Sequence, residues 1–214
     1  HYIICLVRTE APSENRHAGF SQIIVDLKND GAKVRPIRNM AGGEDFNEVV
    51  FDNVLVPKDR IVGEPGNGWQ QVTSELAYER SGPERFLSSF RVFVELVRIC
   101  GDSPSPHQAA AIGRIASHFM TLRRMSLSVA GMLEAGKDVS VEAALVKELG
   151  NNFEKLLPEI ARLVVPDLSA VDPDKQRLFR ETFEETLMLS PSFTLRGGTR
   201  EIMRGVIARG LGLR

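Results

Sequence analysis

The first quarter of the chain carries short hydrophobic runs of the kind that form β-strands. The runs are rich in Val, Ile and Phe, which favour strands, and they occupy residues 2–7, 21–27, 32–37 and 46–56. Turn-forming residues follow two of them, Asn-Asp-Gly at 29–31 and Ala-Gly-Gly at 41–43. No helical pattern intervenes, so we expect the strands to pair in antiparallel fashion.

Apolar residues at helical spacing, together with end signals, predict five helices in the rest of the chain. The first extends from about Asn67 towards Cys100 and is either interrupted or bent near Gly82-Pro83. The others begin at Ser105, at Ser140 with a bend at Pro158, at Asp172 and at Thr199. Long helices joined by short polar loops indicate a bundle.

The predicted fold class is therefore α+β and mostly α. We expect a partial antiparallel β domain over residues 1–60, followed by an up-and-down helical bundle over residues 61–214. The helix that begins at Ser140 is expected to turn one apolar face to the core. That face comprises Leu145, Leu149, Phe153, Leu156, Ile160 and Leu163.

One carboxylate, Glu79, falls in an unusual place on the first predicted helix. At 100° per residue it points into a stripe formed by Trp69, Val72, Leu76, Leu87, Phe90, Val94 and Val97. A carboxylate among apolar side chains is a stronger base, and such bases abstract protons from carbon next to a carbonyl. In the alternative interpretation, Pro83 kinks the helix and turns Glu79 out to a surface arginine.

The charge balance excludes several classes of partner. The 214 residues contain 27 Lys and Arg against 28 Asp and Glu, a formal net charge of -1, so we expect no nucleic acid or anionic membrane surface as a partner. No apolar run is long enough to cross a bilayer. Two distant cysteines and four scattered histidines form no disulfide or metal pattern, which predicts reduced thiols, no metal and a cytoplasmic location.

A second candidate site lies at residues 196–199, Arg-Gly-Gly-Thr, which lead directly into the last predicted helix. Two glycines let the backbone approach a ligand closely, and the unpaired amides of a first helical turn favour negative charge. A pyrophosphate or the edge of a flavin could bind there. Gly-Gly-Thr before a helix is more often an ordinary turn with an N-cap, and both interpretations stay open.

The order of four segments resembles the acyl-CoA dehydrogenase family. These segments are residues 48–57, EVVFDNVLVP, residues 62–64, VGE, residues 66–69, GNGW, and residues 198–204, GTREIMR. The resemblance covers the whole chain and corresponds to the later middle β domain and the C-terminal helical bundle of that family. It implies an FAD enzyme in which a glutamate removes the α proton of an acyl-CoA thioester. The β hydrogen then leaves as hydride to the flavin, giving the trans-2-enoyl-CoA.

The resemblance also implies which residues form the site. In many members the catalytic glutamate directly precedes the Gly-Thr of the C-terminal loop, where this chain has Gly197. Another branch, similar to the isovaleryl-CoA and long-chain enzymes, carries the glutamate on the first bundle helix in a Glu-Arg pair, here Glu79-Arg80. Glu79 is thus implied as the base and Arg80 as its support. The cofactor-binding residues implied are Gly197, Gly198, Thr199 and Glu201.

Two segments depart from the family pattern. Residues 101–108 lack the arginine of an Arg-x-x-Phe-Gly motif that binds the flavin pyrophosphate, and residues 185–191 replace a Gln-x-x-Gly-Gly-x-Gly motif. These departures suit a divergent branch, or a subunit that binds flavin only with help from a different partner chain. The competing interpretation of the whole chain is a non-catalytic structural subunit of a hetero-oligomeric acyl-CoA dehydrogenase complex. The partners implied are an acyl-CoA, an electron-transfer acceptor, and either identical subunits in a dimer or tetramer or a related acyl-CoA dehydrogenase subunit.

The chain also begins directly with a strand-like run at residue 2, without a lead-in. We therefore expect a fragment of a longer protein, and we expect the chain alone to be inactive because half of a β domain and much of the flavin cleft would be missing.

Overall fold

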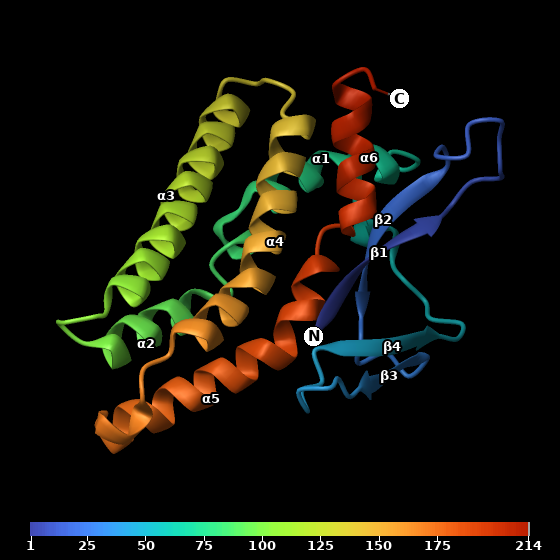
Figure 1. Ribbon diagram of the computed structural model, residues 1–214. Helices are drawn as coiled ribbons and strands as arrows, with labels where there is room; N and C mark the ends of the chain where they lie inside the picture. The colour runs from blue at the N-terminus through green and yellow to red at the C-terminus, as the bar shows by residue number, and fades with distance from the viewer. Residues whose placement is uncertain (214) are drawn as a thin grey trace. The chain divides into compact units, whose positions relative to one another are not determined.

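The structure is a computed structural model that describes residues 1–213 (Figure 1). Its contacts divide the chain into two compact units, His1–Leu76 and a second unit that begins at Ala77. Strands lie in the first unit, and the helices from α2 onward form the second. The predicted class, mostly helical with antiparallel strands, is confirmed.

The first unit contains two small antiparallel sheets. β1 (Tyr2–Arg8), β2 (Phe20–Asp26) and the short β5 (Ile61–Val62) form one sheet in the order β1-β2-β5. β3 (Ala32–Ile37) and β4 (Phe46–Phe51) form a separate ribbon. All four predicted strands are therefore present. β4 ends five residues earlier than the predicted strand because the chain turns at Asn53, where φ is 51°.

The link between strands and helices is held by hydrogen bonds to the first sheet. It contains the 3-10 turn η1 (Lys58–Arg60) and leads into α1 (Gly68–Ser81). The Gly66 amide donates to Oγ of Ser21 at 2.8 Å, and Nε2 of Gln71 donates to the Val62 carbonyl at 2.8 Å. These bonds group the start of α1 with the strands.

The first predicted helix is interrupted near Gly82-Pro83 rather than bent there. The chain forms α1, the 3-10 turn η2 (Pro83–Arg85) and a separate helix α2 (Phe90–Cys100). Pro83 has no amide hydrogen to continue α1, and Gly82 before it is extended, with φ −64° and ψ 156°. The single apolar stripe expected along residues 69–97 is therefore divided between two helices.

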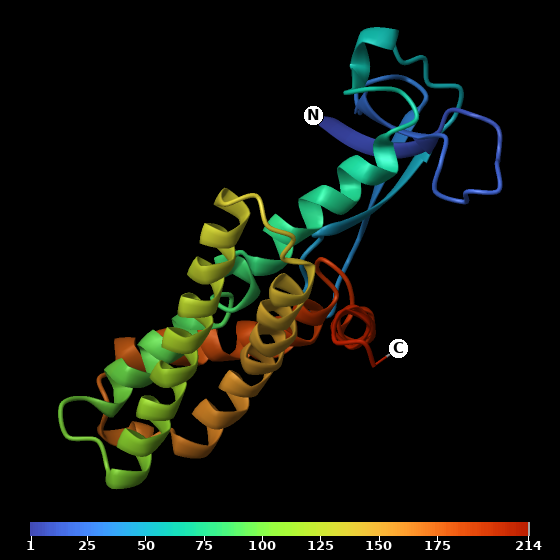
Figure 2. The same ribbon diagram turned by 90° about the horizontal axis from the view of Figure 1, so that it is seen from above.

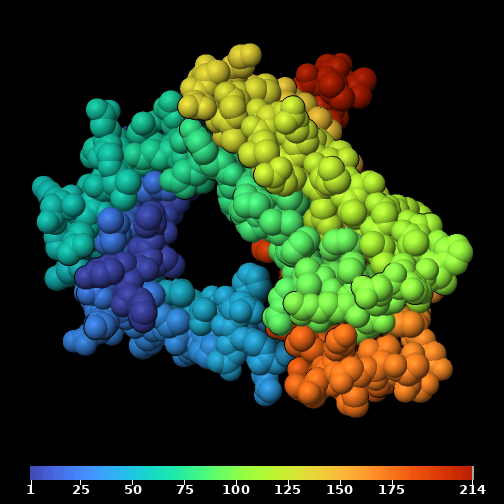
Figure 3. Space-filling view, turned by 90° about the vertical axis from the view of Figure 1, so that its left-hand side faces the viewer, coloured from blue at the N-terminus to red at the C-terminus, as the bar shows by residue number. Residues whose placement is uncertain are grey.

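Two long helices and two shorter ones complete the bundle. α3 (Pro106–Glu134) and α4 (Ser140–Val164) run side by side in Figures 1 and 2, and α5 (Pro173–Leu189) contacts α2. The 3-10 turn η3 (Leu168–Ala170) precedes α5, and η4 (Ser190–Thr194) leads towards α6 (Arg200–Gly210). Figure 3 shows the face of the bundle along which α3 runs.

Two of the four predicted side-chain caps form as expected, at α3 and α5. Ser105 and Gln108 form a capping box at α3, and the Asp172 carboxylate accepts two amides at the start of α5. Ser140 was expected to cap α4, but it is already the first helical residue. The carboxylate of Asp138 accepts its amide at 3.0 Å instead.

The face of α4 that enters the core also differs from the expectation. Leu149, Leu156 and Leu163 are 46%, 45% and 70% exposed, whereas Phe153 is buried as predicted. The buried face consists mainly of small or branched residues, namely Ala143, Val146, Gly150, Leu157, Ala161 and Val164. Small residues occupy the buried face in place of the leucines because they let neighbouring segments approach the helix closely. Gly150, for example, lies against the backbone carbonyl of Arg85.

We predict opposite effects for two Gly→Ala substitutions in helices. In Gly150→Ala the new methyl group would meet the carbonyl oxygen of Arg85, so overpacking should lower the free energy of unfolding by about 1–3 kcal/mol. Gly113→Ala in α3 has open space around it and should raise that free energy by up to about 1 kcal/mol. Urea unfolding measures both, and a neutral Gly150→Ala would contradict the close packing of η2 on α4.

Candidate functional site

The Gly197 turn brings together three segments of the second unit. Gly197 and Gly198 have φ of 65° and 103°, values that L side chains rarely adopt. A β carbon placed on Gly197 would lie 3.1 Å from Oε1 of Glu79 and 3.3 Å from Cε of Lys147. The end of α1, the middle of α4 and the loop before α6 therefore meet at one point.

A buried arginine holds Glu79 in place. Nη2 of Arg85 donates to Oε1 of Glu79 at 2.6 Å, and Nε of Arg85 donates to the backbone carbonyl of Glu79 at 2.8 Å. The Arg85 side chain is 6% exposed and that of Glu79 is 43% exposed. Two bonds from one rigid guanidinium fix both the helix end and the direction of the carboxylate.

This arrangement corrects the expected surroundings of Glu79. The carboxylate does not lie in an apolar stripe, because α1 ends at Ser81 and the stripe does not continue. The alternative interpretation, a kink that turns Glu79 to a surface arginine, is also only half right, because the partner is buried. Oε2 of Glu79 has no hydrogen-bond partner among residues 1–213, so it is free to accept a proton.

Arg80 connects α1 to the glycine turn. Its Nε donates to the Gly197 carbonyl at 3.1 Å. Burial lowers the pKa of Arg80 below its ordinary value, while the charge of Glu79 acts in the opposite direction. Arginine stays protonated in either case, so Arg80 places a fixed positive charge beside the turn.

Lys147 is a member of the site that the sequence analysis did not identify. It lies in α4 and its side chain is wholly buried. Oriented to satisfy both neighbours, the Asn151 amide accepts from Nζ of Lys147 at 2.6 Å and donates to the Phe193 carbonyl at 3.2 Å. Its position one turn from Ala143 and Gly150, on the small-residue face of α4, was the signal available in the sequence.

Glu148 binds α6 to α4. Its Oε1 accepts from Nη2 of Arg200 at 3.1 Å and from Nε of Arg204 at 3.0 Å. Burial acts to raise the pKa of Glu148, but hydrogen bonds from Arg200, Arg204 and Asn152 outweigh burial and lower that pKa. These bonds fix the helix that begins immediately after the glycine turn.

A second buried carboxylate, Glu154, holds the residue before the turn. It accepts from the Ser88 amide at 2.7 Å and from Nη2 of Arg196 at 3.2 Å. The guanidinium of Arg196 lies 4.6 Å from the centre of the Phe193 ring. Burial raises the pKa of Glu154 above its ordinary value even though Ser88 and Arg196 oppose this.

The residues predicted to bind a cofactor lie together at the start of α6. A β carbon on Gly198 would lie 3.0 Å from Cε of Met203, so the turn has no room for a side chain there. Thr199 is the N-cap residue but its side chain makes no capping bond to the helix. Hydrogen bonds from its own amide and from Thr199 lower the pKa of Glu201, which is fully exposed.

These features fit part of a flavin site. Two glycines at positive φ, placed at a helix N-terminus, present bare backbone to a planar or anionic group. The segment from 101 to 108 does not offer an arginine. Its Gln108 caps α3 and also donates from Nε2 to the Val164 carbonyl at 3.0 Å. The glycine turn therefore fits FAD, while this segment fits a structural role.

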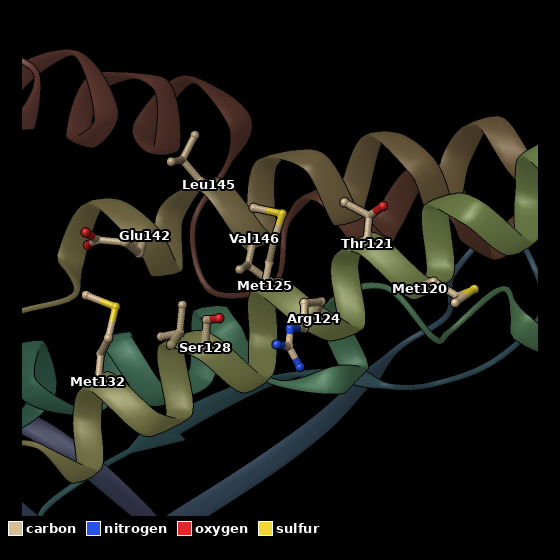
Figure 4. Close-up of a pocket in the computed structure, with 10 residues that line it drawn as sticks. Met120, Thr121, Arg124, Met125, Ser128, Met132, Glu142, Leu145 and Val146 are labelled. Carbon is tan, nitrogen blue, oxygen red and sulfur yellow. The ribbon is translucent and has the colours of Figure 1, made fainter.

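Other features of the described residues lie apart from this site. A hollow of about 490 Å³ between α3 and α4 is lined mainly by apolar residues and contains none of the predicted site residues (Figure 4). Among residues 1–213, no group of three or more His, Cys, Asp or Glu is placed to hold a metal ion. Within the same range, no helix is long and apolar enough to span a membrane.

Comparison with known proteins places this geometry in context. The chain is 32% identical to acyl-CoA dehydrogenase IpdE1 of Mycobacterium tuberculosis over 212 residues, which cover 97% of this chain and 54% of that protein. It is 29% identical to acyl-CoA dehydrogenase IpdE1 of Mycolicibacterium smegmatis, covering 97% and 52%. The chain thus spans about half the length of the curated relatives it matches. No family model matches it.

Solved structures share the fold at low identity. An acyl-CoA dehydrogenase from Mycobacterium smegmatis superimposes with a TM-score of 0.81 at 20% identity, covering 100% of this chain and 57% of that one. The ChsE4-ChsE5 complex of Mycobacterium tuberculosis gives 0.75 at 24%, covering 100% and 57%. PigA, solved with FAD and proline, gives 0.79 at 18%, covering 100% and 56%. The predicted resemblance to acyl-CoA dehydrogenases is confirmed.

We predict that Glu148→Gln loosens α6. Removing the charge that two arginines share should lower the free energy of unfolding by about 1–3 kcal/mol near pH 7. Because the folded pKa of Glu148 lies below its ordinary 4.5, its contribution is present above about pH 4.5 and is lost as pH falls through the folded value. Urea unfolding at several pH values measures this loss.

The matched control is Glu159→Gln, which removes an exposed ion pair with Arg162 on the same helix. That change should alter stability by less than about 0.5 kcal/mol. Equal effects of the two substitutions would show that Glu148 does not anchor α6.

Proposed function

This chain is related in sequence and fold to acyl-CoA dehydrogenases over about half of their length. We propose that it supplies the proton-abstracting part of an FAD-dependent acyl-CoA dehydrogenase site. In the proposed reaction an acyl-CoA thioester is oxidised to the trans-2-enoyl-CoA. The rest of the site comes from the half of the relatives' length that this chain does not span, or from a related subunit.

One observation carries this proposal. The carboxylate of Glu79 and the turn at Gly197 are 118 residues apart in sequence, yet a β carbon on Gly197 would lie 3.1 Å from Oε1 of Glu79. By resemblance, these are the two positions at which the family carries its catalytic glutamate. Their convergence in space supports Glu79 as the residue that takes the place of a glutamate at 197.

The proposed role of Glu79 is general base. Arg85 holds Oε1 and leaves Oε2 free to accept the α proton. Arg80 fixes the Gly197 carbonyl, so the turn and the carboxylate keep their mutual position when the proton arrives. After the transfer the neutral carboxyl group still accepts the bond from Arg85.

The proposed cofactor is FAD, held in part by Gly197, Gly198, Thr199 and Glu201. The two glycines would let the flavin edge approach the backbone, and Thr199 and Glu201, which are hydrogen-bonded to each other, would flank it at the start of α6. When bound, FAD accepts the β hydrogen of the substrate as hydride. PigA, a structural neighbour, is described with FAD, which supports this choice of cofactor.

A second candidate function is that of a non-catalytic subunit that supports a partner's active site. The observation that favours it is Gln108, which together with Ser105 forms a cap where the family carries an arginine. The ChsE4-ChsE5 neighbour is described as a complex of two different chains. We propose that this chain assembles either with copies of itself or with such a related subunit.

Flavin content separates these alternatives. We expect the purified 214-residue chain to carry no stoichiometric FAD, because it spans about half of its relatives and offers no pyrophosphate-binding arginine at 101–108. The visible flavin spectrum of the chain alone and of its complex with a related subunit measures this. Full FAD occupancy of the isolated chain would show that the site is complete without further protein.

We predict that Glu79→Gln, in the flavin-loaded assembly, slows reduction of the flavin by acyl-CoA about 10²-fold to 10⁴-fold, the usual cost of losing a general base. Flavin content and folding should be unchanged, because the amide oxygen of Gln can still accept from Arg85. Stopped-flow absorbance measures the rate. The matched control is Glu75→Gln, an exposed residue one turn earlier on α1, which should reduce at the parent rate.

Moving the carboxylate gives a second arm of the same test. Glu79→Gly combined with Gly197→Glu should recover part of the lost rate, because the two positions are adjacent. Recovery should be incomplete, since Gly197 has a φ of 65° that a glutamate resists. If Glu79→Gln itself keeps the parent rate, Glu79 is not the base and Glu84, on η2, becomes the next candidate.

A further inference from the structure

Lys147 is a buried cation without a carboxylate of its own. Its side chain is wholly inaccessible, and the hydrogen bond from Nζ goes to the uncharged amide of Asn151. Among residues 1–213 it forms no ion pair. Burying an unpaired ammonium costs free energy that an apolar side chain would avoid. The presence of this charge at that cost points to a role for Lys147 at this position.

That position is the candidate site itself. Cε of Lys147 would lie 3.3 Å from a β carbon on Gly197, and Oε1 of Glu79 would lie 3.1 Å from the same atom. The end of the lysine thus lies against the glycine turn, next to the carboxylate. Through Asn151, which donates to the Phe193 carbonyl, Lys147 is also connected to η4, the segment that leads into this turn.

The charges around Lys147 leave the site positive. They come from α1, η2, the loop before α6 and α4 itself, and comprise Glu79, Arg80, Arg85, Arg196 and Glu148. Both carboxylates are already bonded to arginines. Burial first, and then the charges of Arg85, Arg196 and Arg80, lower the pKa of Lys147 to about 8.

We propose that Lys147 is a positioning residue for the candidate base. Its ammonium holds the Gly197 turn against the end of α1 and stabilises the negative charge of Glu79. This inference rests on the proposed function for the role of Glu79. It adds to the site a positive charge, the Lys147 ammonium, that is lost when the lysine is deprotonated. When Lys147 gives up its proton, the turn and the carboxylate lose that support.

The first test uses the protein without substrate or cofactor. Backbone amide NMR signals of Gly197 and Gly198 are followed from about pH 6 to 10 in the parent, in Lys147→Met and in Lys155→Met. Lys155 is an exposed lysine on the same helix and serves as the matched control. The parent and Lys155→Met should show a titration with a midpoint near pH 8. Persistence of that titration in Lys147→Met would overturn the proposal.

Folding of the variant can be checked in the same samples. Methionine fills a similar volume without a buried charge, so Lys147→Met should be at least as stable as the parent at pH 7. The folded pKa of Lys147 is lowered from 10.5 to about 8, so the parent carries a penalty below about pH 8. Its stability should rise between about pH 8 and 10.5, and Lys147→Met should lack this rise.

The second test measures function in the flavin-loaded assembly. Lys147→Met should slow flavin reduction by about 10-fold near pH 7 and abolish an alkaline decline with a midpoint near pH 8. An unchanged rate and pH profile in Lys147→Met would refute the positioning role. The base is tested separately by Glu79→Gln. If Lys147→Met loses the amide titration but Glu79→Gln keeps the parent rate, the proposed function is rejected and the contact of Lys147 with the turn is not.

Discussion

The buried guanidinium of Arg85 is the interaction on which the site depends. It arises because Pro83 ends α1 and turns the chain inward, which carries Arg85 into the bundle against Gly150 of α4. From there it bonds both the backbone and the side chain of Glu79. An arginine in the core is stable only if its donors are satisfied, so the end of α1 and the position of Glu79 are determined together.

The charges of the second unit form a connected network rather than separate ion pairs. Glu148 binds α6, Glu154 binds the residue before the glycine turn, and Arg80 binds the turn itself. The bonds of Glu154 and Arg80 join the loop at 196–199 to α4 and α1, and those of Glu148 join α6, which follows the loop, to α4. The loop is short of apolar side chains that could anchor it by packing, so its conformation is maintained mainly by charged hydrogen bonds.

Much of the fold could be predicted from local patterns, because strands, helix caps and helical periodicity each depend on residues that are close together in the sequence. Pro83 was correctly identified as a break, but whether it bends or ends a helix depends on whether Arg85 finds partners inside the core. The buried face of α4 was misjudged for a related reason. Leucines such as Leu163 have the greater hydrophobicity, yet close approach of η2 selects Gly150 and alanine.

The contacts around the candidate site could not be predicted from the sequence. Glu79 and Gly197 were singled out from sequence, but their contact with each other is long-range and no spacing encodes it. Lys147 was missed because a lysine in a helix is usually an exposed residue. Only the small residues on its side of α4 distinguished it from Lys155, which lies on the exposed side.

The adjacency of Glu79 and Gly197 limits how such a site can change in evolution. Carboxylates at both positions would crowd each other, since the first atom of a side chain at 197 already lies 3.1 Å from Oε1 of Glu79, and two like charges so close disfavour each other. With the proposed role for Glu79, moving the glutamate from one position to the other therefore takes two substitutions, and either one made first weakens the site. A second subunit with an intact site could carry the activity meanwhile, so pairing of unlike chains would make the exchange tolerable.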